Sequence, residues 1–255
     1  MRIKVINPNT TAGMTAKIGE AARAIAAPGT EIVAVNPVFG PVSIESHYDE
    51  AVSVLGVLEE VRKGEEEGCD GYIIACFGDP GLLAAREIAT GPVVGIAEAA
   101  MHAASFISTG FSIVTTLTRT CIIAEHLVER YGMHHACRKV RGTDIPVLDL
   151  EETGSAALHT ILGECRRAAA EDRCGAIVLG CAGMADLAAI VQREVGMPVI
   201  DGVAAAVVQV EGLVRLGLGT SKHGDLAWPL PKPYTGSLAH FAPTGRVPGD
   251  RGTRS

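Results

Sequence analysis

Two stretches of the chain place a cysteine in the same local setting. They read CDGYIIACFGDPGL at residues 69–82 and CGAIVLGCAGMADL at residues 174–187. In each, an apolar run typical of a buried strand leads to a cysteine, Cys76 or Cys181, and a glycine turn follows. A thiol near the N-terminus of a helix has a lowered pKa, so we expect a thiolate within reach of neutral pH. One cysteine could then accept a proton while the other donates one, which predicts inversion of a carbon stereocentre from its two faces.

The turn after each cysteine contains a glycine, Gly78 or Gly183. Glycine lets the backbone approach a small ligand closely. We therefore expect the N–H groups of Phe77, Gly78, Ala182 and Gly183 to bind an oxyanion, such as the enolate that forms when a carbon loses its proton. A hydrolase of the cysteine/histidine type needs one nucleophile and one base, and it would leave the second cysteine without a role.

Polar residues after other apolar runs are further candidates for substrate binding. Asn9 follows the first run, where it could bind a ring or a carbonyl group, or cap the next helix. Thr115 and Thr116 follow a later run, and capping by Thr118 is the alternative there. Asp79 could bind a ring N–H, or it could belong to an Asp-Pro-Gly turn that starts a helix.

A long connection follows the second apolar run. A loop of this length over a cleft often shapes a pocket, and Ile44 is expected to form an apolar wall. His47, in the same loop, is expected to be solvated rather than to relay protons. No metal site is predicted, because His134, His135 and Cys137 lack a second ligand pair at suitable spacing.

Apolar runs that alternate with amphipathic segments predict the elements that must position these residues. This alternation is typical of an α/β fold with a parallel sheet, in which ligands bind beyond the carboxyl ends of the strands. The predicted strands lie at residues 2–6, 31–35, 71–75, 92–96, 112–116, 176–180 and 197–200. The predicted helices lie at residues 11–27, 48–66, 81–89, 97–107, 119–131, 153–172, 184–195 and 202–216.

The similarity of the two cysteine stretches extends into an internal repeat. When Cys76 is placed over Cys181, GPVVGIAEAA also falls near GMPVIDGVAAA. We therefore predict two pseudo-symmetric α/β halves, residues 1–108 and 109–218, with the active site in the cleft between them and with strands open to exchange near their ends. Residues 219–255 form a tail rich in proline and glycine, and the last dozen residues are expected to be disordered.

Composition narrows the classes of partner. The formal net charge of −7 offers no basic surface for nucleic acid or an anionic membrane, and aromatic residues make up only 4% of the chain, too few for a base-stacking platform. No apolar run reaches the length of a membrane span or a signal sequence. The 7 cysteines are an odd number and are expected to be free thiols, so we expect a cytoplasmic protein.

Several motifs together resemble the aspartate/glutamate/hydantoin racemase superfamily, and within it the hydantoin racemases and their relatives, the allantoin racemases. The similarity covers about residues 1–240. The matching pieces are INPNT (6–10), GPVSIESHYDEA (40–51), ACFGDPGL (75–82), GFSIVTTLTRT (110–120), EHLVERYGM (125–133), LGCAGM (179–184), PVIDGVAAAV (198–207) and PLPKPYTG (229–236).

The resemblance implies a cofactor-independent two-base racemase in which Cys76 and Cys181 are the catalytic pair. Amino-acid racemases of the superfamily follow their cysteines with Asn-Thr or Thr-His elements, whereas this chain has CFGD and CAGM. The departure favours a neutral cyclic ureide, a 5-substituted hydantoin, whose ring stabilises the carbanion without pyridoxal phosphate. The resemblance also implies a homo-oligomer.

Other functions remain open at this point. Allantoin is itself a hydantoin with a ureido group at C5, so allantoin racemisation is the nearest alternative. A decarboxylase or another isomerase of the superfamily would use the two cysteines less symmetrically. A non-catalytic protein that binds a small molecule between two α/β halves is the alternative from a different class.

Overall fold

The first four strands form one parallel sheet in a computed structural model that describes residues 1–150 and 155–243. The strand order is β2-β1-β3-β4, and every neighbouring pair is parallel. The strands are β1 (Arg2–Ile6), β2 (Glu31–Val35), β3 (Gly71–Ile74) and β4 (Val93–Gly95). All four residues of β3 are buried, as expected for a central strand of a parallel sheet that is covered on both faces.

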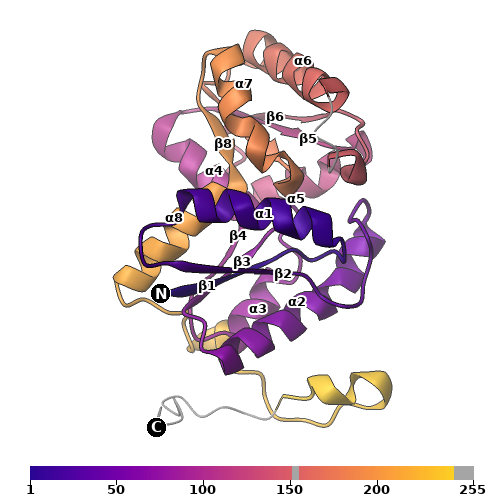
Figure 1. The fold of residues 1–255 in the computed structure, drawn as a ribbon, viewed down its shortest axis with the longest axis vertical. Helices are drawn as coiled ribbons and strands as arrows, with labels where there is room; N and C mark the ends of the chain where they lie inside the picture. The colour runs from indigo at the N-terminus through magenta and orange to yellow at the C-terminus, as the bar shows by residue number, and fades with distance from the viewer. Residues whose placement is uncertain (151–154, 244–255) are drawn as a thin grey trace.

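A second parallel sheet repeats the first in strand order. It runs β6-β5-β7-β8, so each strand has a counterpart in the first sheet (Figure 1). The strands are β5 (Phe111–Thr115), β6 (Cys137–Gly142), β7 (Ala176–Gly180) and β8 (Val199–Asp201). The prediction of two pseudo-symmetric parallel-sheet α/β halves is confirmed.

Helices cover both faces of each sheet. They are α1 (Ala12–Ile25), α2 (His47–Glu67), α3 (Leu82–Ile88), α4 (Ile96–Ile107), α5 (Cys121–Arg130), α6 (Ser155–Glu171), α7 (Ala188–Val195) and α8 (Gly202–Arg215). Each predicted helix and strand overlaps an observed one, but β6 was not predicted. The chain therefore has one more strand in its described part than its hydrophobic pattern indicates.

Alternate strand residues serve different layers of the molecule. In β3, Ile73 joins a central apolar cluster, whereas Tyr72 and Ile74 join an outer cluster with α2 and α3. In β7, Val178 faces the central cluster, whereas its neighbour Leu179 faces an outer cluster with α6 and α7. The central cluster contains residues from both sheets, so the two sheets share one core.

The two sheets exchange helices rather than strands. Helix α4 follows β4 of the first sheet but packs against β7 and β8, and α8 follows β8 but packs against β3 and β4. The two helices also pack against each other (Figure 1). They cross closely where they begin, because a Cβ atom on Gly202 would lie 2.6 Å from the carbonyl oxygen of Ile96. The expected exchange of strands does not occur among the described strands, and the residue boundaries of the two halves stay a prediction.

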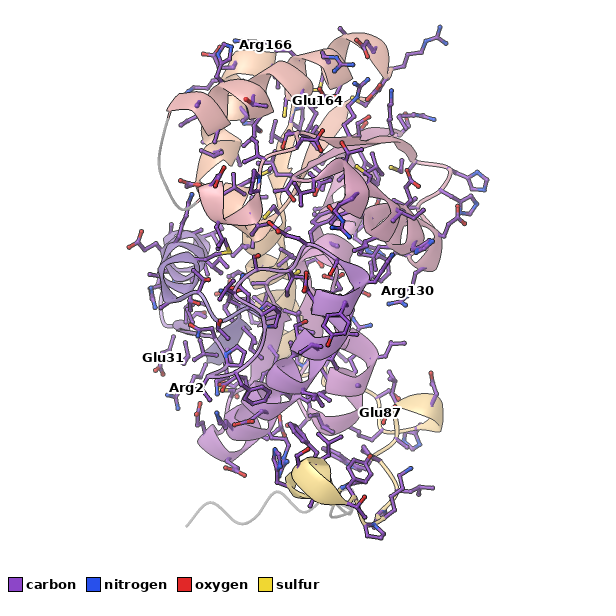
Figure 2. The ribbon with its side chains drawn as sticks, turned by 90° about the vertical axis from the view of Figure 1, so that its right-hand side faces the viewer. Arg2, Glu31, Glu87, Arg130, Glu164 and Arg166 are labelled. Carbon is purple, nitrogen blue, oxygen red and sulfur yellow. The ribbon has the colours of Figure 1, made fainter. Side chains whose placement is uncertain are left out.

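The tail runs along α2 and α3 without forming a core element. Lys222 Nζ donates hydrogen bonds to the carbonyl oxygens of Arg86 and Glu87, at 2.5 and 3.0 Å, and lies over the Trp228 ring. In Figure 2, Glu87 marks the side of α3 that faces the tail. The prediction of disorder for the last dozen residues falls on residues 244–255, outside the described residues. Within the described part of the chain, no helix combines the length and apolar character needed to cross a membrane.

Candidate active site

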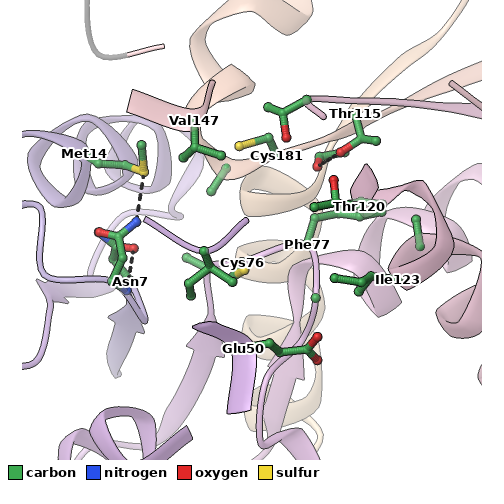
Figure 3. A pocket seen from close by; sticks show the side chains of 18 residues that line it. Asn7, Met14, Glu50, Cys76, Phe77, Thr115, Thr120, Ile123, Val147 and Cys181 are labelled. Carbon is green, nitrogen blue, oxygen red and sulfur yellow. Dashed lines mark hydrogen bonds between the residues drawn. The ribbon is translucent and has the colours of Figure 1, made fainter. Parts of the chain in front are cut away.

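Cys76 and Cys181 line the same pocket. It lies where the carboxyl ends of the central strands of both sheets meet. Figure 3 shows Cys181 with Val147 and Thr115 on one side and Cys76 on the other. The pocket is lined by Asn7, Asn9, Met14, Ile44, Glu50, Ala75, Cys76, Phe77, Gly78, Thr115, Thr116, Thr120, Ile123, Ala124, Val147, Gly180, Cys181 and Ala182.

Each cysteine stands in a tight turn just after a buried central strand. The backbone N–H of Asp79 donates to the carbonyl oxygen of Cys76 at 3.0 Å, and that of Met184 donates to the carbonyl oxygen of Cys181 at 3.1 Å. The Gly78 N–H donates to the Cys76 sulfur, and the Gly183 N–H donates to the Cys181 sulfur. Oxyanion binding by the N–H groups of Phe77, Gly78, Ala182 and Gly183 stays a prediction.

Burial raises the pKa of both thiols, contrary to the expected lowering. Desolvation raises the pKa of Cys76 well above its usual value and that of Cys181 to about 11, while the glycine N–H groups oppose the shift. The helix α3 begins only at Leu82, some way after Cys76, whereas Cys181 is the N-cap residue of a 3-10 helix (Ala182–Leu187) that leads into α7. Both cysteines are therefore mainly thiols at neutral pH.

The charges around the two thiols differ. The positive charge of Lys17 lowers the pKa of Cys181. The Lys17 Nζ donates to the Leu150 carbonyl oxygen at 2.8 Å and forms an ion pair with Asp186 at 3.1 Å. Around Cys76, the sulfur of Cys181 and then the carboxylates of Asp79 and Glu50 raise the thiol pKa further. At Cys181, Glu45 raises the thiol pKa, but by less than Lys17 lowers it. Cys181 therefore ionises more readily than Cys76.

Seven of the nine residues expected to contact a ligand line the pocket: Asn9, Ile44, Phe77, Gly78, Thr115, Thr116 and Ala182. Gly183 and Asp79 are not among its lining residues. Gly183 instead packs beneath the turn, where a Cβ would lie 3.0 Å from Leu150 Cδ1 and 3.7 Å from the Cys181 sulfur.

The side chain of Asn9 is held by a local network with one weak contact. Its Oδ1 accepts from Asn7 Nδ2 at 2.8 Å and from the Thr11 N–H at 2.9 Å. Its Nδ2 donates to the thioether sulfur of Met14 at 3.4 Å (Figure 3). A thioether is a weak acceptor, so this N–H group can turn to a carbonyl oxygen in the pocket.

The two threonines after β5 have different roles. Thr115 Oγ1 donates to the Gly180 carbonyl oxygen at 2.7 Å, which joins the end of β5 to the residue before Cys181. Its hydroxyl proton is therefore not available to a ligand. Among the described residues, no hydrogen bond is recorded for the Thr116 hydroxyl, which lines the pocket and can donate to a bound molecule.

Asp79 is used to hold the fold together beside the pocket. Its buried carboxylate accepts from the N–H groups of Ala97 and Glu98, at 3.1 and 2.9 Å, and from the Tyr131 hydroxyl at 2.6 Å. Desolvation raises the pKa of Asp79 to about 7, and these hydrogen bonds oppose the rise. Its oxygens are therefore occupied by protein donors, and binding of a ring N–H by Asp79 stays a prediction.

Glu50 and Val147 line the pocket but were not expected from the sequence. Glu50 belongs to the first turn of α2, and desolvation raises the pKa of its carboxyl group. Glu50 belongs to GPVSIESHYDEA, one of the motifs that carry the family resemblance, but nothing in the motif indicated that its side chain lines the pocket. Val147 comes from the second half, and its N–H donates to Glu45 Oε1 at 2.8 Å across the cleft.

His47 begins α2, and its side chain is 65% exposed, as expected for a solvated histidine. Its ring stacks on that of His126 with the centroids 6.4 Å apart. Throughout residues 1–150 and 155–243, no group of three or more His, Cys, Asp or Glu side chains is arranged to hold a metal ion.

Comparisons with known proteins match nearly the whole chain. The Asp/Glu/Hydantoin racemase family model matches residues 3–210. Hydantoin racemase from Pseudomonas sp. (strain NS671) is 50% identical over 241 residues, which cover 94% of this chain and 97% of that protein. Hydantoin racemase from Rhizobium meliloti is 51% identical over 236 residues, covering 92% of this chain and 98% of that protein. The structure of allantoin racemase from Klebsiella pneumoniae has a TM-score of 0.93 at 58% identity, covering 95% of this chain and 99% of that one.

Proposed function

The chain belongs to the Asp/Glu/Hydantoin racemase family, and from this premise we propose that it inverts C5 of 5-substituted hydantoins with Cys76 and Cys181 as its two bases. The observation that carries the proposal is the place of the two thiols. They follow equivalent central strands of the two sheets and line one pocket. A planar carbanion between them has one thiol on each face.

The proposed reaction moves one proton at each thiol. The thiolate of one cysteine removes the proton from C5, and the electron pair moves onto the neighbouring C4 carbonyl to give an enolate. The thiol of the other cysteine then protonates C5 on the opposite face. The first cysteine ends as a thiol and the second as a thiolate. Proton exchange with solvent then restores the starting state, or the enzyme binds the opposite enantiomer next.

Donors in the pocket support the enolate. The expected oxyanion donors Phe77 and Ala182 line the pocket, and two side-chain donors lie in it as well. The Nδ2 of Asn9 has only a thioether acceptor, and the Thr116 hydroxyl lines the same pocket. We assign these two groups to the ring oxygens, where a hydrogen bond strengthens as negative charge develops.

The walls of the pocket allow two kinds of C5 substituent. Ile44, Ile123 and Val147 offer an apolar wall for an alkyl or aryl group, as in hydantoin racemase substrates. The carboxylate of Glu50 also lines the pocket, and a carboxylate accepts hydrogen bonds from a ureido group. Together with the 58% identity to an allantoin racemase, Glu50 supports allantoin racemisation as the second candidate function.

The test follows circular dichroism of optically pure L-5-benzylhydantoin and (S)-allantoin, in separate reactions with purified, reduced protein. We expect the signal of at least one substrate to decay to zero, with equal amounts of both enantiomers at the end. The ratio of kcat/KM for the two substrates decides between the candidate functions. A flat trace with both substrates, from protein shown to be folded, would contradict racemisation of hydantoins and favour a binding protein.

A matched control removes both thiols without changing the pocket's volume appreciably. The Cys76→Ser/Cys181→Ser variant should be folded and inactive, because a serine hydroxyl is ionised far less than a thiol at the same pH. Residual decay equal to that of the wild type would remove the cysteines from the mechanism. The homo-oligomeric state and the cytoplasmic location stay predictions.

A further inference from the structure

Helices α4 and α8 occupy equivalent places but are capped differently. The N-cap residue of α8 is Asp201, whose carboxylate accepts from the N–H groups of Val203 and Ala204, at 3.0 and 2.8 Å. The N-cap residue of α4 is Gly95, which has no side chain to offer. The N–H groups at the start of α4 are nevertheless satisfied, because Asp79 supplies the carboxylate from the Cys76 turn.

The fit between Asp79 and the start of α4 is close. A Cβ atom at Gly95 would overlap the carboxylate of Asp79, so the glycine makes room for it. Asp79 adopts a left-handed backbone conformation with φ 46°, which is uncommon for a residue other than glycine. Its side chain is 1% exposed. Three donors and a carboxylate thus form a closed, buried network one turn away from Cys76.

The network crosses from the first half to the second. Its third donor, Tyr131, is the C-cap residue of α5. Helix α4 packs against β7 and α5 against β6, and both strands belong to the second sheet. The turn that carries Cys76 is therefore fastened to α4, which packs on the second sheet, and to α5, which belongs to the second half.

The Cys181 turn has no counterpart of this network. The residue in the place of Asp79 is Met184, which is fully buried in the apolar cluster of the second sheet. Among the described residues, the Asp201 carboxylate accepts hydrogen bonds from Val203 and Ala204 of α8 and from no residue of the Cys181 turn. The two thiols are thus positioned by different means within a pseudo-symmetric fold.

We propose that Asp79 is the positioning residue for Cys76: by capping α4 in place of Gly95 and binding Tyr131, it fixes the Cys76 thiol relative to the opposite half of the molecule. Asp79 does not touch the substrate in this role. The inference rests on the proposed function for its kinetic consequence, because Cys76 matters for catalysis only if it transfers a proton.

The experiment separates the two thiols by using single-cysteine parents. The Cys181→Ser parent retains Cys76, and the Cys76→Ser parent retains Cys181. Each parent is incubated with the enantiomer of 5-benzylhydantoin whose C5 proton it exchanges in D₂O, and loss of the C5–H signal is followed by proton NMR. Asp79→Asn is then added to each parent, since the amide nitrogen places a donor where an acceptor is needed.

We expect Asp79→Asn to slow exchange by Cys76 about tenfold or more, because a small misplacement of a reacting group lowers its rate steeply. Exchange by Cys181 should stay within about twofold, as for an independent site. Asp201→Asn is the matched control, since it removes a carboxylate cap of equal kind from α8, and it should leave both exchange rates within about twofold. Equal losses in both parents, or no loss in the Cys181→Ser parent, would overturn the proposal.

A second measurement does not depend on activity. Iodoacetamide labelling, read by mass spectrometry of the Cys76 and Cys181 peptides, should become about fivefold faster or more at Cys76 in both Asp79→Asn and Tyr131→Phe, because the released thiol is more accessible. Tyr131→Phe keeps the Asp79 carboxylate, so it separates greater access from the lower thiol pKa that follows loss of that charge. Labelling of Cys181 should not change. If neither parent exchanges C5–H, the proposed function fails, and the labelling result alone decides the role of Asp79. Unchanged labelling of Cys76 would then overturn the proposed positioning role. Should Asp79→Asn not fold, Tyr131→Phe, which removes one donor, is measured in the same way and is expected to show the same selectivity.

Discussion

At the scale of single residues, the chemistry of the site is that of two thiols with unequal neighbours. The ammonium group of Lys17 favours the thiolate of Cys181, whereas Glu50 and Asp79 disfavour that of Cys76. The predominant singly ionised state therefore has a Cys181 thiolate and a Cys76 thiol. This state already contains one base and one acid, which is what inversion from one enantiomer requires.

The raised pKa values predict how activity depends on pH. Since burial raises the pKa of Cys181 to about 11 and that of Cys76 further, only a small fraction of the enzyme carries a thiolate at pH 7. The thiolate fraction grows with pH below the pKa, so kcat/KM should rise by up to about tenfold per pH unit between about pH 7 and 9. The measurement is the initial rate of circular dichroism decay at each pH, after subtraction of the rate with the double serine variant. A level profile over this range would show that the resting thiols are not raised in pKa.

The sequence was informative for the cysteines and less so for the residues beside them. Cys76 and Cys181 could be paired because both follow an apolar run and precede a glycine turn, and these signals are local. The direction of their pKa shifts could not be predicted, because it depends on burial by distant segments. The same holds for Asp79, whose partners Ala97 and Tyr131 come from elements that only the folded chain brings together.

At the scale of elements, the pocket is closed by loops from both halves. The segment before α2 carries Ile44, and the segment after β6 carries Val147. The Val147 N–H donates to Glu45 Oε1, which joins the two walls. This single polar link between two loops holds the apolar wall against which we expect the C5 substituent to pack.

We predict that Glu45→Ala raises KM for 5-benzylhydantoin while kcat changes little. A hydrogen bond to a carboxylate contributes about 1.5 to 3 kcal/mol, and part of this loss is regained when substrate fills the pocket. We therefore expect KM to rise about threefold to tenfold. Steady-state kinetics with both enantiomers provides the measurement. Glu45→Gln keeps an acceptor oxygen and is the matched control, with KM near that of the wild type. A fall in kcat with unchanged KM would place Glu45 in the chemical step instead.

Strand β6 shows why one element could not be predicted. It lies at the edge of the second sheet, with exposed Arg138 and Lys139 and only a short apolar pattern. Charged residues are common on edge strands, where they discourage pairing with other chains. Its one buried side chain, Arg141, forms ion pairs with Glu164, Glu171 and Asp172. Ion pairs between distant segments leave no hydrophobic periodicity in the sequence. The seven predicted strands had such a signal, because they are apolar.

At the scale of the whole molecule, exchange of α4 and α8 makes each sheet depend on the other half. The face of β3 and β4 that joins the central core is covered by a helix that follows β8. Val210 of that helix is fully buried, and a Cβ on Gly71 would lie 2.5 Å from its Cγ1. Neither sheet can therefore complete its core from its own half. The repeat in the sequence predicted two halves, but it gave no sign of this exchange.

We predict that both sheets unfold in one cooperative transition and that Val210→Ala destabilises both together by about 2 kcal/mol. Urea unfolding is followed by far-UV circular dichroism and by hydrogen exchange of peptides from each sheet. Val208→Ala is the control on the same helix, because Val208 is 53% exposed, and its effect should stay within about 0.5 kcal/mol. Destabilisation of peptides from the first sheet alone would contradict a shared core.

The most direct test of the central claim is stereospecific exchange by the two single-cysteine variants. Cys76→Ser and Cys181→Ser are each incubated in D₂O with each pure enantiomer of 5-benzylhydantoin, and deuterium at C5 and enantiomeric composition are followed together. The two-base account predicts that neither variant racemises the substrate appreciably, and that each exchanges C5–H of one enantiomer only, with opposite enantiomers for the two variants. Racemisation by either single variant at a rate near that of the wild type, or exchange of the same enantiomer by both, would contradict it.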